Sequence, residues 1–253
     1  SIRKSFKRSY VFSGSYEDDK IEDIDDKYEK DIRAGHEMWL NMKGGMISRR
    51  YGINDNIRGL FHFETELSIN DKSFLINPRL YYSRSRRLGI FEIDLINRTE
   101  FIKALSGVIP IYKRFFLGET FIGKYLFLNS EMETYGSYFN NVRGYRFSQI
   151  GDLRGNTIYT ITNLEFSIPV ITESNEAIVK FLVFYDIGQG WYDFDKIRFR
   201  VGKRDNDFKS SIGVGIKITA LRFLDIIINW GYGFNHKEGE DKTDLTFFVT
   251  KVF

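Results

Sequence analysis

Residues 211–218 read SIGVGIKI, and this short stretch decides the fold class. Isoleucine or valine occupies every second position, and serine, glycine or lysine stands between them. Strict alternation with a period of two is typical of a β-strand whose two faces meet different surroundings. Residues 224–232 follow with the same pattern, because large apolar side chains share one face and Asp225, Asn229 and Gly231 share the other. The pattern predicts two adjacent strands of an all-β protein.

The same alternation recurs along most of the chain. Most of the segments reach the roughly 9–11 residues that a tilted strand needs to cross a membrane. A further hairpin inside residues 113–139 would raise the number of strands from ten to twelve. The ten predicted strands lie near residues 5–15, 36–48, 56–70, 73–84, 89–103, 157–168, 177–188, 210–219, 222–233 and 244–253.

The two faces of these strands favour a membrane barrel over a soluble one. One face is uniformly apolar, with aromatic residues near its ends, and the other mixes charged, amide and glycine residues. A soluble β-sandwich or a lipocalin-like barrel also alternates, but it packs its apolar face inward and needs fewer and shorter strands. Aromatic residues make up 17% of the chain. We therefore predict a transmembrane antiparallel β-barrel of about 10–12 strands.

The lengths of the links between strands agree with this prediction. Bacterial outer-membrane barrels have short periplasmic turns and long outer loops. If the chain ends on the periplasmic side, the short links on that side are residues 49–56, 84–88 and 219–221. The long links on the outer side are then residues 17–33, 108–156 and 189–208. The short link at residues 70–72 is an exception, because it lies on the outer side.

Three motifs follow one another in the second half of the chain. Residues 142–145 read VRGY, and the approach to them, residues 109–118, reads IPIYKRFFLG. Residues 164–169 read LEFSIP. Residues 184–188 read FYDIG, and Trp191 follows shortly after. Each motif alone would occur often by chance, so their order and spacing carry the information.

Taken together, the motifs resemble the Omp85 superfamily, the BamA-, TamA- and Sam50-like barrels of the bacterial surface antigen D15 type. In that family a VRGF/Y motif lies on a long loop that folds back into the barrel. The strands that follow carry an LE-F-x-x-P pattern and an F-x-D-x-G pattern. The resemblance covers residues 109–253 best, while the first hundred residues match only as generic strands. We expect residues 1–253 to form a single outer-membrane barrel domain with a long internal loop.

The resemblance assigns roles to particular residues. By alternation, Glu165 and Asp186 face the inside of the barrel. A guanidinium in a partly desolvated lumen seeks a carboxylate in a forked pair, so Asp186 is the first candidate partner of Arg143 and Glu165 the second. The alternative is a solvated loop arginine beside an ordinary lumen-lining aspartate. The internal-loop motif comprises Val142, Arg143, Gly144 and Tyr145, and its expected partners in the barrel are Asp186, Glu165 and Gly188.

Phe253, the last residue, follows the pattern of an outer-membrane assembly signal, which is an aromatic residue ending an amphipathic strand. A plain hydrophobic end to the last strand is the simpler interpretation. The two interpretations coexist, since an aromatic side chain is stable at the membrane interface.

Enzyme chemistry is not expected. The chain has no cysteine, and its three histidines lack metal-ligand spacing, so we predict no metal site and no cofactor. No G-x-S-x-G sequence occurs, and no catalytic residue is predicted. The acidic residues 17–31 would offer oxygen ligands to Ca²⁺, but an exposed outer loop is favoured because the EF-hand spacing is missing. A net charge of +3 gives little reason to expect nucleic acid as a partner.

The resemblance implies a non-enzymatic barrel that takes part in insertion or translocation of proteins or lipids at an outer membrane. That membrane would belong to a Gram-negative-type bacterium or to an organelle. The expected partners are outer-membrane lipid, protein or lipid substrates at the seam between residues 6–15 and 245–253, and a homo-oligomer or larger assembly. No residues for POTRA domains are found, so the chain is either a reduced member or a piece of a longer protein. The alternative is a small passive pore or structural barrel that keeps the family loop without assembly activity.

Overall fold

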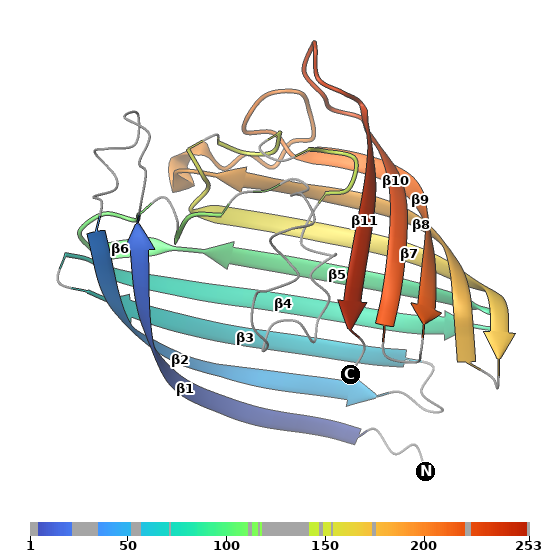
Figure 1. Ribbon diagram of the computed structural model, residues 1–253, viewed down its shortest axis with the longest axis horizontal. Coiled ribbons are helices and arrows are strands. Elements are labelled where there is room, and N and C mark those ends of the chain that lie inside the picture. The colour runs from blue at the N-terminus through green and yellow to red at the C-terminus, as the bar shows by residue number, and fades with distance from the viewer. Residues whose placement is uncertain are drawn as a thin grey trace.

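The computed structural model describes residues 5–21, 35–51, 57–70, 72–110, 113–115, 117, 142–146, 149–152, 154–173, 176–220 and 224–251. Its strands form one antiparallel sheet that curls strongly around its inner face (Figure 1). The order in the sheet is β1-β2-β3-β4-β5-β7-β8-β9-β10-β11, so every strand lies beside its neighbour in the sequence. This arrangement confirms the predicted all-β, antiparallel fold class.

Ten strand positions are occupied, and each matches a segment predicted from alternation. β6 is not an additional position, because it continues β5 after Ile102 and pairs with the same strand, β4. The strands are β1 Ser5–Ile21, β2 Gly35–Tyr51, β3 Ile57–Ile69, β4 Phe74–Leu88, β5 Phe91–Phe101, β6 Lys103–Ser106, β7 Ile158–Glu173, β8 Glu176–Trp191, β9 Lys209–Ala220, β10 Leu224–Gly233 and β11 Thr243–Lys251.

Some strands are longer than alternation predicted. β1 continues to Ile21, because its ladder with β2 runs on without a break from Ser5↔Tyr51 to Ile21↔Gly35. β7 continues past Pro169, where its register with β8 shifts. Backbone pairing does not need apolar side chains, so a hairpin can extend beyond the amphipathic part of its strands. The additional hairpin considered inside residues 113–139 falls mainly on residues outside those that the structure describes.

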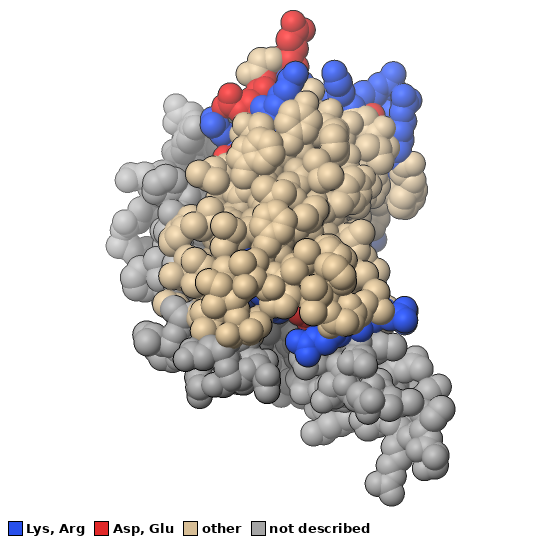
Figure 2. Space-filling model, turned by 90° about the vertical axis from the view of Figure 1, so that its right-hand side faces the viewer, with Lys and Arg blue, Asp and Glu red and all other residues tan. Residues whose placement is uncertain are grey.

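The two faces of the sheet have opposite character. On β8, Phe181, Val183 and Tyr185 are exposed on the outer face, whereas Phe184 and Asp186 are buried on the inner face. Figure 2 shows the result on one side of the molecule, where a broad band without charged residues separates two rims that carry lysine, arginine and acidic residues. Outward apolar and inward polar residues are the arrangement of a membrane barrel and the reverse of a soluble one. Buried polar residues on the inner face include Asn163, Glu165, Ser211, Asp225 and Asn229.

The links between strands differ in length at the two rims. At one rim consecutive strands are close in sequence: β2 ends at Tyr51 and β3 begins at Ile57, and two or three positions separate β4 from β5, β7 from β8 and β9 from β10. At the opposite rim 13 positions separate β1 from β2, 51 separate β6 from β7, 17 separate β8 from β9 and 9 separate β10 from β11, whereas only four separate β3 from β4. By the rule that outer loops are long, this second rim is the outer one.

β1 and β11 are the two edges of the sheet. Among the strands that the structure describes, none pairs with the outward edge of either, so the curled sheet is open. The described residues contain no POTRA domain. Within the described part of the chain, no helix has the length and apolar character needed to span a membrane.

Candidate functional site

Residues 142–145 lie against the inner face of the sheet, where they contact β7, β8, β9 and β10. Val142, Arg143 and Tyr145 are each 0% exposed. Val142 and Tyr145 share a buried apolar cluster that also includes residues of the loop and of β7, namely Leu117, Ile150, Tyr159 and Ile161. The motif is therefore packed into the sheet and does not lie in solvent.

Arg143 forms a forked pair with Asp186 and a further bond to Glu165. Its Nε and Nη2 atoms donate to the two carboxylate oxygens of Asp186, each at 2.8 Å. Its Nη1 donates to Glu165 at 3.0 Å. The backbone N–H of Arg143 also donates to Asp186, at 3.0 Å. The guanidinium carbon lies 3.6 Å from the centre of the Phe184 ring, so the cation also stacks on an aromatic face.

Burial makes this pairing obligatory. Burial alone would lower the pKa of the Arg143 guanidinium, but the charges and hydrogen bonds of Asp186 and Glu165 outweigh it and hold that pKa above its usual value. Arginine thus stays charged, and a buried charge is tolerated only with partners such as these. Removing one partner of a buried pair costs about 3–5 kcal/mol, because the remaining charge is left buried alone.

Gly144 permits a close approach between the loop and β10. Its φ is +85°, in the left-handed region that favours glycine. A Cβ added to Gly144 would lie 2.9 Å from the backbone of Gly231 in β10. Gly188 plays a comparable role on β8, since a Cβ there would lie 2.8 Å from a methyl group of Val142. The glycines of the loop and of the strands thus allow the backbone of the loop to approach the sheet closely.

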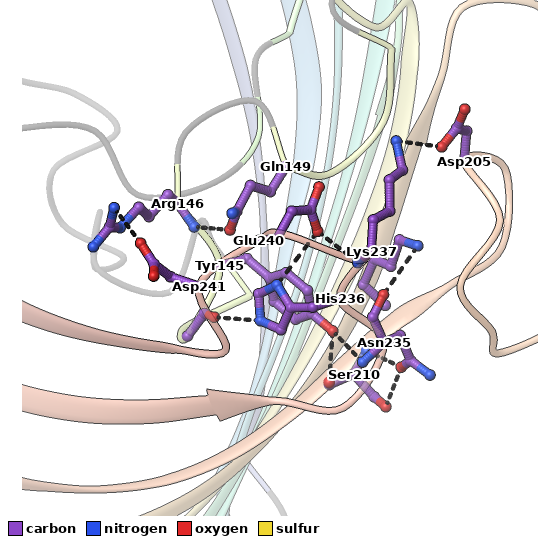
Figure 3. Close-up of polar contacts among 12 residues, drawn as sticks. Tyr145, Arg146, Gln149, Asp205, Ser210, Asn235, His236, Lys237, Glu240 and Asp241 are labelled. Carbon is purple, nitrogen blue, oxygen red and sulfur yellow. Dashed lines mark hydrogen bonds and ion pairs between the residues drawn. The ribbon is translucent and has the colours of Figure 1, made fainter.

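Tyr145 connects the loop to the outer ends of β9 and β10. Its hydroxyl donates to the Ser210 carbonyl oxygen at 3.1 Å and accepts from the backbone N–H of Asn235 at 2.9 Å (Figure 3). Its ring stacks on His236, with centroids 4.3 Å apart. Burial raises the pKa of Tyr145 to about 12, so the hydroxyl stays protonated and able to donate near neutral pH.

The outer loop between β10 and β11, residues 234–242, covers the motif. Nε2 of His236 lies 3.2 Å from the Gly144 carbonyl oxygen, and its Nδ1 lies 3.5 Å from a carboxylate oxygen of Glu240 (Figure 3). Arg146 reaches Asp241 of the same loop at 2.6 Å, although both side chains are more than half exposed. A buried aromatic stack and a surface ion pair thus join the two loops.

A second charged group lies on the inner face, on β3, β4 and β5. Arg79 contacts Glu64 at 3.1 Å, Glu66 at 2.8 Å and Glu100 at 3.4 Å. Tyr159 of β7 donates to Glu100 at 2.8 Å. This network lies on the inner face of the sheet, and most of its residues are far in sequence from residues 142–145. None of the three sequence motifs indicated it.

Comparison with known proteins now bears on the site. The Omp85 superfamily domain matches residues 73–251, which is well over half of the chain. The chain belongs to the Omp85 superfamily. It is thus a member of a family of outer-membrane β-barrels, and the VRGY loop and the strands that hold it lie inside the matched region.

Two solved structures match this chain. The crystal structure of BamA from Haemophilus ducreyi lacking POTRA domains 1–3 matches with a TM-score of 0.70 and 13% identity, over 96% of this chain and 51% of that chain. CdiB from Acinetobacter baumannii matches with a TM-score of 0.38 and 11% identity, over 98% of this chain and 47% of that chain. The chain spans about half the length of the BamA structure. No curated protein sequence matches it.

The structure places the expected site residues as follows. Arg143 meets both Asp186 and Glu165, and Gly188 contacts Val142. Phe253 lies outside the described residues. Sequence reasoning missed several residues that hold the loop. Phe184 belongs to the third motif but was not expected to stack on Arg143, and the others come from strands and loops distant in sequence and belong to none of the motifs. The missed residues are Phe184 as a stacking partner, Ser210, Gly231, Asn235 and His236.

Proposed function

We propose that this protein is an outer-membrane Omp85 barrel, without enzymatic activity, that takes part in the insertion or translocation of proteins or lipids. In this proposal residues 1–253 form one barrel domain, and residues 142–145 act as an internal plug tied to its wall. The observation that supports it most is the fully buried Arg143, held by two carboxylates on adjacent strands and by the Phe184 ring. Arg143 is the charged centre of the attachment, which Tyr145 and the apolar cluster around Val142 supplement.

The open edges of the sheet supply the second part of the proposal. In hydrocarbon every backbone N–H and C=O needs a partner, so an unpaired strand edge does not persist there. β1 and β11 run antiparallel across the gap, because the sheet has an even number of strand positions and its ends start and finish at the same rim. We propose that these two strands form a weak seam, at which a substrate strand or lipid enters.

A reconstitution experiment tests the proposal. The protein is inserted into phosphatidylcholine vesicles, and the folding rate of an unfolded small outer-membrane barrel protein is measured by its heat-modifiable mobility. A fluorescent-lipid assay in the same vesicles measures transfer of lipid between leaflets. We expect at least one of the two rates to exceed the rate in empty vesicles, and Arg143→Ala to change that rate.

A control variant and a contrary outcome make the result decisive. Arg154→Ala removes an exposed arginine of the same long link that pairs with Asp152 and forms no hydrogen bond or ion pair with residues 142–145, and it should leave both rates unchanged. If the inserted protein conducts ions but accelerates neither protein folding nor lipid transfer, the assembly function is wrong and the protein is a passive pore.

A further inference from the structure

The outer loop between β8 and β9 carries an unusual segment. Residues 197–204 read IRFRVGKR, which places four cations and an aromatic side chain within eight residues that contain no carboxylate. The loop lies on the rim that bears the long links. No hydrogen bond, ion pair or ring contact among the described residues joins it to residues 142–145, so the plug does not explain it.

The segment is held in a defined shape. Phe208 donates its backbone N–H to the Arg200 carbonyl oxygen at 2.7 Å, and Gly202 donates back to Phe208 at 3.1 Å. The buried Lys209 ammonium donates to the carbonyl oxygens of Gly202 and Arg204. Hydrogen bonds from Phe208 and Lys209 thus hold the backbone of this segment. None of these bonds uses the basic side chains of the segment.

The four cations are available for a ligand. Arg198, Arg200, Lys203 and Arg204 are all exposed, and none forms an ion pair with a residue that the structure describes. Among the nearby carboxylates, Asp193 pairs with Lys196 and Asp205 pairs with Lys237, while the exposed Asp195 and the buried Asp207 form no ion pair with a described residue. The four cations therefore keep their charges exposed, and an anionic group would stabilise them.

Phe199 shows which kind of surface this site meets. Its side chain is 91% exposed, although it stands between two arginines. It stacks at 6.3 Å on Phe208, which in turn packs edge-on against Trp191 at 5.3 Å. Trp191 shares the alternation of Val183 and Tyr185 on β8, but at the end of the strand it is buried, with 2% of its surface exposed. The aromatic group therefore lies at the outer end of β8, and Phe199 is its exposed member.

Aromatic side chains flanked by lysine and arginine are typical of the boundary between hydrocarbon and headgroups. We propose that residues 198–204 dock the phosphate groups of anionic lipid in the outer leaflet, with Phe199 entering the lipid beside them. The site rests on the proposed placement of the barrel in an outer membrane. It deepens that proposal by naming a lipid class that the rim above β8 and β9 recognises.

Binding of a single lipid class tests the site in detergent, where membrane insertion is not required. The detergent-solubilised protein is mixed with lipid A carrying two phosphates, with the same lipid after phosphate removal, or with phosphatidylcholine. Native mass spectrometry measures the fraction of protein that retains each lipid. We expect retention of the phosphorylated form at the lowest lipid concentration.

Variants locate the site. Each basic side chain near an anionic membrane surface contributes about 1 kcal/mol, so Arg198→Gln with Arg200→Gln should weaken retention by at least about tenfold. Arg86→Gln with Arg87→Gln is the matched control, because it removes two exposed arginines at the opposite rim. Phe199→Ala should weaken retention by a smaller factor, and Phe199→Trp should preserve it.

Each remaining outcome counts against the inference. Equal retention by the Arg198/Arg200 double variant and wild type, or an equal loss in the Arg86/Arg87 control, would overturn the site. Equal binding of the dephosphorylated lipid would show that the site does not recognise phosphate groups. Displacement of the lipid by millimolar inorganic phosphate would indicate a free-phosphate site. Flotation with phosphatidylcholine vesicles reports membrane insertion separately, so failure of the proposed function is seen apart from failure of the lipid site.

Discussion

The backbones of Gly144 and Gly231 touch: a Cβ on Gly231 would lie 2.7 Å from the backbone nitrogen of Gly144. One glycine belongs to the internal loop and the other lies near the outer end of strand β10. The contact leaves no room for a methyl group, so the fit of the loop depends on glycine at both positions.

Gly231→Ala should therefore loosen the internal loop. The added methyl group meets backbone atoms, which cannot rotate away, so the loop must move by several tenths of an ångström. We expect a loss of about 1–3 kcal/mol in the stability of the folded loop. Limited proteolysis across residues 118–141 gives the measurement. Gly89→Ala is the control, because it introduces the strain of a positive φ but meets no atom within 4 Å; equal sensitivity in both variants would contradict the prediction.

Arg143→Ala should release the loop more strongly. The substitution leaves Asp186 and Glu165 buried and mutually repelling, at a cost of about 3–5 kcal/mol. Ion leakage through planar bilayers should rise. Arg143→Lys should leak to an intermediate degree, because an ammonium cannot reproduce the forked pair with Asp186. Conductance equal to that of wild type in both variants would show that the arginine does not anchor the plug.

Alkaline pH should act on Tyr145. The neutral hydroxyl donates to Ser210, and a phenolate cannot. Because the folded pKa is raised from 10.0 to about 12, the loop's stability from this group is complete below pH 10 and is lost as pH rises to about 12. Absorbance of tyrosinate at increasing pH should show a late step that Tyr145→Phe lacks. Identical titration curves for the two proteins would refute the assignment.

The seam between β1 and β11 can be trapped by disulfides, since the chain has no cysteine of its own. Val11→Cys is combined in turn with Leu245→Cys, Phe247→Cys and Val249→Cys, and each single variant is the control. If the strands close on one another, at least one pair should form an intramolecular bond that blocks heat-induced unfolding on a gel. Disulfides found only between two copies would instead mean that the edges pair across an oligomer.

The sequence predicted the strands well because alternation reports directly which face meets lipid. It underestimated β1, whose end pairs without an apolar face, as the ladder from Glu17 to Ile21 shows. It also underestimated β7, where the register with β8 shifts after Pro169 and breaks the alternation. The pairing of Arg143 with Asp186 and Glu165 was predicted because the resemblance to the Omp85 superfamily places the VRGY loop inside the barrel, where a desolvated guanidinium needs carboxylates and these two alternate inward. Stacking of Tyr145 on His236 was not, because no periodic pattern relates residues 91 positions apart.

The contacts of residues 142–145 also bear on how the molecule acquires its structure. Those described go to Leu117 and Ile150 of the loop itself and to residues 159–236, and none goes to β1, β2 or β3. The loop closures that these contacts need therefore involve only the chain from Leu117 onward, and the entropic cost of closure rises only slowly with the length of the closed segment. The loop and the last strands are thus able to fold as a cooperative nucleus on which the earlier hairpins assemble, and the plug would be seated before the rest of the wall exists.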